Sequence, residues 1–164
     1  MGFWTAQHIW NVMPREQREQ AAAALWTDEH MSREQRLAAI APWLSSRGMR
    51  IAFLEKLPRT RRAALIAQAG VPEDTAMQAL MSFHLVHRRE LLAAFLDALE
   101  IEHEDGLIKD ASEIEPPDDK KVGAAIKKLR KSFPEDQVDL YLETLTAADP
   151  ETWSAVARAI PEQS

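Results

Sequence analysis

The sequence predicts an all-α protein, an irregular multi-helix bundle of about seven or eight helices. Glycine is scarce, with 5 in 164 residues, whereas the strong helix formers Ala, Leu, Glu, Gln and Arg are abundant. No alternating run of β-branched residues, the pattern typical of strands, occurs along the chain. Signals for helix starts recur instead, and they divide the chain into consecutive helical segments.

The stretch from Pro72 to Glu100 predicts one long central helix, continuous or kinked. It contains no internal Gly or Pro, and an acidic start at Glu73–Asp74 suits the positive end of a helix dipole. A break into two helices near 87–89 is the alternative, which we disfavour because no turn residue stands there. Two apolar stripes cover nearly the whole circumference, so the helix is expected to be buried on several sides. They are formed by Ala76, Leu80, Phe83, Val86, Leu91, Phe95 and Ala98, and by Met77, Met81, Leu85, Leu92, Leu96 and Leu99.

Before the central helix, three segments begin with similar residues and suggest an irregular α-α repeat. Residues 13–18 match residues 31–36, and a fainter copy lies at 57–66. Because the spacing between copies is not constant, recurring helix-start chemistry is the simpler explanation. Ser32 and Gln35 have the spacing of a capping box, and Pro42 is expected to kink or split the helix that they start. Short helices are expected over 3–12 and 49–57.

Beyond Leu99 the composition predicts three regions: an N-terminal helical lobe (1–100), an acidic connector (101–119) and a three-helix lobe (120–164) that packs on the first. The connector contains Asp105–Gly106, which favours a tight hairpin. Residues 100–119 hold nine acids and one Lys, whereas residues 120–131 hold six cations and no acid. We expect the connector to fold over the basic helix, either as simple charge complementarity or as a mask that a partner releases.

The composition excludes several classes of protein. A net charge of −6 argues against a nucleic-acid partner, and the absence of Cys removes disulfides, thiolate metal sites and cysteine nucleophiles. No leader pattern and no membrane-length apolar run is present, so we expect a soluble cytoplasmic protein with no membrane partner. Nucleotide-binding loops and nucleophile elbows are also missing, and no cofactor or resident metal is expected.

Arginines in the first turns of predicted helices form one candidate site. Free backbone N–H groups and the positive dipole end favour anions there, so a carboxylate or a phosphate is the expected ligand. The alternative is that the arginine stems cover apolar surface while their charged ends stay in water. The candidates are Arg15, Arg18, Arg33, Arg36, Arg59 and Arg62.

A polar band in the central stretch is the second candidate. His84 and His87 lie three residues apart and share a helical face with Arg88 and Glu90 nearby. A metal site is not predicted, because paired Glu-x-x-His motifs within apolar helices are missing.

These patterns favour a noncatalytic helical module that binds another protein, with a homo-oligomer as a further option. The alternative is a small-molecule- or metal-binding helical protein, with an enzyme as one form of it, that uses His84, His87 and Arg88.

Overall fold

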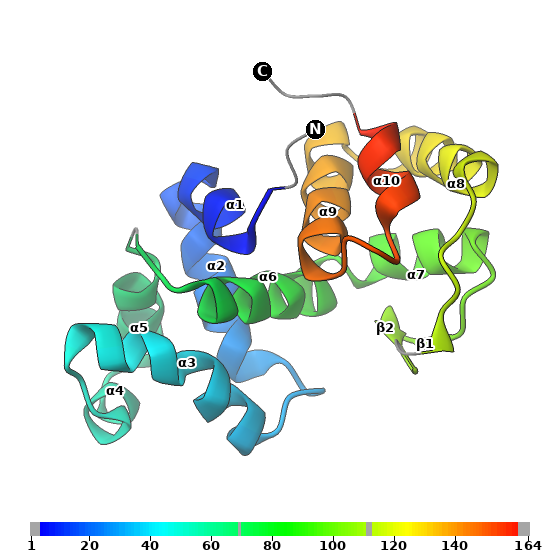
Figure 1. The fold of residues 1–164 in the computed structure, drawn as a ribbon. Coiled ribbons are helices and arrows are strands. Elements are labelled where there is room, and N and C mark those ends of the chain that lie inside the picture. The colour runs from blue at the N-terminus through cyan, green and yellow to red at the C-terminus, as the bar shows by residue number, and fades with distance from the viewer. Residues whose placement is uncertain (1–3, 69, 111–112, 161–164) are drawn as a thin grey trace. The chain divides into compact units, whose positions relative to one another are not determined.

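The computed structural model describes residues 4–68, 70–110 and 113–160, and these residues form ten α-helices and one two-stranded hairpin (Figure 1). An all-α fold is therefore confirmed, with more helices than expected. The elements run α1 (Ala6–Val12), α2 (Arg15–Thr27), α3 (Arg33–Arg47), α4 (Ile51–Lys56), α5 (Arg59–Ile66), α6 (Glu73–His87), α7 (Arg89–Ala98), β1 (His103–Glu104), β2 (Leu107–Ile108), α8 (Asp119–Ser132), α9 (Glu135–Ala148) and α10 (Ser154–Ala159).

The chain divides into two compact units, a first unit from Thr5 to Val86 and a second unit that contains Trp4 and the residues from His87 onward. The sequence places the lobe boundary in the 101–119 connector instead. The difference arises because α7 packs against α8, which joins α7 to the C-terminal helices.

The predicted long central helix is in fact two helices. α6 ends at His87, and Arg88 leaves the helical conformation at φ −127° and ψ 27° before α7 starts at Arg89. We expected a break in the helix only at a Gly or a Pro. The conformation of Arg88, however, has a negative φ that any residue can adopt. The Arg88 side chain also donates to the carbonyl oxygen of His87 at 3.2 Å, which satisfies an acceptor that the interrupted helix leaves open.

Local signals set the helix ends of the first unit. The Ser32 hydroxyl accepts from the backbone N–H of Gln35 at 3.1 Å, and the Gln35 side chain accepts from the Ser32 N–H at 2.9 Å, which confirms the capping box. Gly48 ends α3 in the left-handed conformation at φ 61°. Pro42 was expected to kink or split this helix; α3 continues from Arg33 to Arg47 and is not split, and the kink stays a prediction.

The first unit buries aromatic and branched side chains from most of its helices, and α2 packs along α5. Glu73 fixes the start of α1, since its carboxylate accepts from the backbone N–H groups of Ala6 and Gln7, both at 2.9 Å. The largest fully buried side chains of this unit are Trp10, Trp43, Phe83, Ile9, Leu25, Ile40, Leu54, Ile66 and Leu80.

The second unit combines α7, the hairpin and the three C-terminal helices. α8, α9 and α10 pack on one another, and Phe95 of α7 contacts the rings of Tyr141 and Trp153 at centroid distances of 5.7 and 6.1 Å. The predicted hairpin is present, with β1 and β2 antiparallel and both Asp105 and Gly106 at positive φ. Such a pair of residues suits a tight two-residue hairpin turn.

Candidate functional site

The six arginines of the predicted anion site lie in different local environments. Arg15 pairs with Glu19 of its own helix at 3.3 Å, and Arg33 pairs with Glu55 of α4 at 3.2 Å. Arg18 is partly buried, and its Nε makes no hydrogen bond within the described part of the chain. These contacts engage Arg15 and Arg33 with acids of the same unit.

Arg36 and Arg62 instead stabilise the ends of neighbouring helices. Arg36 Nε donates to the carbonyl oxygen of Leu25 at 2.6 Å, near the end of α2. Arg62 Nε and Nη2 donate to the carbonyl oxygens of Leu57 and Glu55 at 2.9 and 2.5 Å. A guanidinium at a helix C-terminus supplies donors to open carbonyls and suits the negative end of the dipole.

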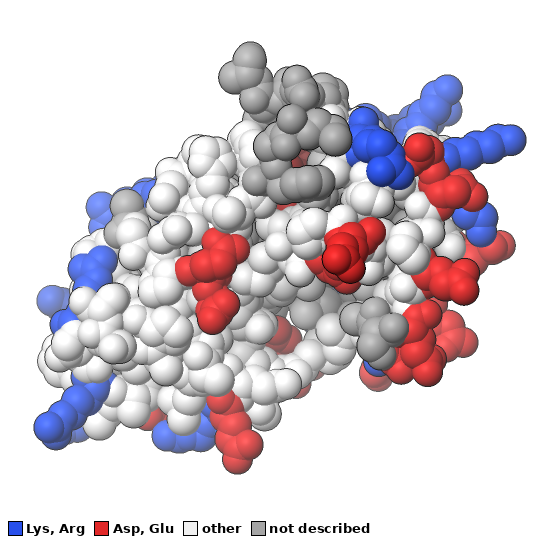
Figure 2. All heavy atoms as spheres, viewed as in Figure 1, with Lys and Arg blue, Asp and Glu red and all other residues white. Residues whose placement is uncertain are grey.

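Arg59 differs from the other five, because it is exposed and belongs to a run of exposed cations at α4 and the start of α5 that also contains an exposed phenylalanine. We call this cluster the basic corner; it consists of Arg50, Phe53, Lys56, Arg59 and Arg61. Phe53 is 53 % exposed, and only it and Val12 are large apolar residues exposed to this degree in the described structure. Figure 2 shows separate basic side chains along the edge of the molecule where Figure 1 draws α4 and α5.

The charge of this corner is not neutralised within the described residues. Residues 47–62 contain six cations and one acid, Glu55, which already pairs with Arg33. Arg62 binds backbone carbonyls, and Arg47 lies over the Trp43 ring at 5.9 Å. The four cations of the corner form no side-chain hydrogen bond or ion pair with any other residue that the structure describes.

The geometry of α4 explains why Phe53 is exposed beside a cation. Leu54 is fully buried and anchors the helix to the unit. Phe53 and Lys56 are three residues apart in α4, so they are neighbours on the helix surface, and Arg50 is the extended N-cap residue that precedes the helix. Phe53 lies about 100° around the helix axis from Leu54, and its residue is 53 % exposed.

Arg62 connects the helices that carry the basic corner to each other and to α2. Its two hydrogen bonds tie the start of α5 to the end of α4, and its guanidinium lies over the Trp26 ring of α2 at 5.5 Å. The pair between Arg33 and Glu55 adds a tie from α3. The exposed residues of the basic corner therefore belong to short helices that are fixed by the contacts of Arg62 and by the ion pair between Arg33 and Glu55.

The residues of the polar band belong to two units, with His84 in the first unit and His87, Arg88 and Glu90 in the second. His84 is fully buried in α6 and lies edge-on to Phe83 at 5.5 Å. His87 is exposed at the end of the helix, and its pKa lies below its ordinary value because partial burial and the Arg88 charge both disfavour the protonated ring. Glu90 is exposed in the first turn of α7. Among the described residues, no group of three or more His, Asp or Glu side chains is placed to hold a metal ion.

The basic side chains of α8 are largely exposed. Lys121 pairs with Glu100, the residue before the connector, at 3.4 Å, and both partners are exposed. Lys120, Lys127 and Lys131 are also exposed. The described residues of the connector therefore do not mask this helix as the sequence suggested.

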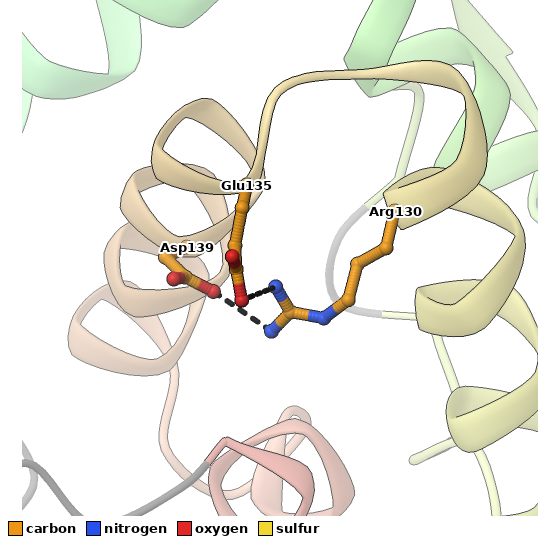
Figure 3. A network of polar contacts seen from close by, with 3 residues as sticks. All are labelled: Arg130, Glu135 and Asp139. Carbon is orange, nitrogen blue, oxygen red and sulfur yellow. Dashed lines mark hydrogen bonds and ion pairs between the residues drawn. The ribbon is translucent and has the colours of Figure 1, made fainter.

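A carboxylate cluster on α9 was not foreseen from the sequence. Arg130 pairs with Glu135 at 3.4 Å and with Asp139 at 2.8 Å (Figure 3). One turn further on, Glu143 is half-buried, and burial together with the Asp139 charge raises its pKa to about 7. The cause is local: a carboxylate that loses water and faces a second carboxylate favours the protonated form.

None of the comparisons with known proteins indicates a function for this chain. No family model matches the chain, and neither the curated proteins nor the solved structures include a detectably similar one. No helix of the described residues is long and apolar enough to cross a membrane.

Proposed function

We propose that the protein is a noncatalytic interaction module and that its basic corner binds a segment of another protein. The observation that carries this proposal is the exposed ring of Phe53 among cations that have no partner in the described chain. Aromatic side chains and arginines are the residues that most often dominate the binding energy of protein interfaces.

The way the corner is held supports a binding role. Arg62 and Leu54 fix α4 and α5 from the buried side, so docking a partner would order few additional backbone torsions. The alternative function, small-molecule or metal binding at the polar band, has less support, because His84 is buried whereas His87 is exposed.

Selection from a displayed library of random peptides tests the proposal without assuming the partner's chemistry. The full chain should enrich a family of related peptides, and the Phe53→Ser variant should not retain them. Phe53 is exposed, so this substitution removes the ring with little effect on folding.

The Val12→Ser variant is the matched control, because Val12 is also exposed, at 57 %, and belongs to α1. It should retain the enriched peptides. A library that yields no enriched family, or a family that Phe53→Ser still binds as tightly, would contradict the proposed function.

A further inference from the structure

We infer that the segment bound by the basic corner is an acidic peptide in which carboxylates flank a bulky apolar side chain. This inference rests on the proposed function and adds the chemistry of the partner. It follows from charge, spacing and local screening.

The basic corner carries four cations and no acid. Arg50, Lys56, Arg59 and Arg61 are exposed and have no partner among the described residues, and the only acid in residues 47–62 is engaged elsewhere. An acidic segment would supply this charge, and complementary potentials of this kind speed association and exclude basic partners.

Cations stand on both sides of Phe53 in the chain. Lys56 follows Phe53 by three residues within α4, which corresponds to about 4.5 Å along the helix axis, and Arg50 precedes Phe53 by three residues as the extended N-cap of the helix. An extended peptide advances about 3.3 Å per residue. With its apolar side chain against Phe53, its acids should therefore lie one or two positions away on both sides. Arg59 and Arg61 extend the basic surface beyond Lys56 and would meet further acids on that side.

The screening of charges by salt favours a short peptide over a nucleic acid as the partner. At physiological ionic strength the field of a charge decays over about 8 Å, so a short peptide responds to the corner itself. A nucleic acid extends past the corner and meets a chain of net charge −6. A lipid surface is disfavoured because Phe53 is the only large exposed apolar side chain in the described parts of α4 and α5.

The exposed lysines of α8 provide an internal comparison. This helix carries exposed Lys120, Lys127 and Lys131, but no large exposed apolar residue belongs to it. If charge alone attracted the peptide, substitutions on α8 would weaken binding as much as those at the corner.

Fluorescence anisotropy with the full chain tests the inference. The probe is a short labelled peptide with a central leucine and two glutamates on each side, and a second probe has glutamine at every glutamate position. The glutamate peptide should bind with an affinity that falls as salt rises, and the glutamine peptide should bind at least about ten-fold more weakly.

Variants then locate the site. Phe53→Ser and the double variant Arg59→Ala/Arg61→Ala should each weaken binding about ten-fold, whereas Lys127→Ala/Lys131→Ala should change it less than about two-fold. Circular dichroism confirms that each variant retains its helices.

Three results would overturn the inference: equal binding of both peptides, equal loss from the α8 variant, or tighter binding of a single-stranded oligonucleotide or of phosphatidylserine vesicles at the corner. Its failure can be told apart from failure of the proposed function. If the library yields nonacidic peptides that depend on Phe53, only the partner's chemistry is wrong. If neither the library nor the probe binds, both fail.

Discussion

Glu143 makes the stability of the second unit depend on pH. Its pKa is raised from 4.5 to about 7, first by burial and then by the neighbouring charge of Asp139. The folded protein therefore holds this proton more tightly than the unfolded chain does. The contribution of Glu143 to the free energy of unfolding is fully present below pH 4.5, and it is lost as the pH rises through about 7.

The size of this effect follows from the difference between the two pKa values. Each pH unit between them corresponds to about 1.4 kcal/mol, so the ceiling is roughly 3 kcal/mol. Because Glu143 is only half-buried, solvent screens part of the penalty, and we expect about 1–2 kcal/mol. Glu143→Gln keeps the shape and removes the titration.

Urea denaturation followed by circular dichroism measures the prediction. At about pH 4 the variant and the parent should unfold with nearly equal free energies, and at about pH 8 the variant should be more stable by the expected 1–2 kcal/mol. Glu151→Gln is the control, since Glu151 is exposed in the same unit and should show no such pH-dependent gain. If Glu143→Gln gives the same difference at both pH values, or destabilises the protein at high pH, the proposed environment of Glu143 is wrong.

Substitutions at three further positions test the packing and the caps, each by the shift of the urea midpoint. Arg62→Ala should destabilise the first unit by about 1–2 kcal/mol, because it leaves the carbonyls of Glu55 and Leu57 without a donor, and an unchanged midpoint would contradict this. Phe95→Ala should cost about 3–5 kcal/mol, because the ring is fully buried, and a loss under about 1 kcal/mol would refute the packing of α7. Ser32→Ala should cost about 1 kcal/mol through the lost capping box, whereas Ser32→Asp should retain most of it.

Part of the candidate site was visible in the sequence. Arg59 was proposed as an anion ligand from its place in a first helical turn, and the partner chemistry of that site remains a prediction. Arg50, Phe53 and Lys56 were missed, although one signal was available: a phenylalanine three residues from a cation on each side, within a run that holds a single acid. That signal could not show that Phe53 is exposed while Leu54 is buried.

The sequence by itself determined the helical class and many helix ends, because these depend on contacts between residues three or four positions apart. The capping box at Ser32, the left-handed Gly48 and the turn at Asp105–Gly106 all belong to this kind. The tertiary structure alone decided that α6 ends at His87, that Arg62 spans two helices, and which face of α4 stays in water. For Arg62 and for α4, the acceptors and the buried surface come from another helix, and no local pattern contains that information.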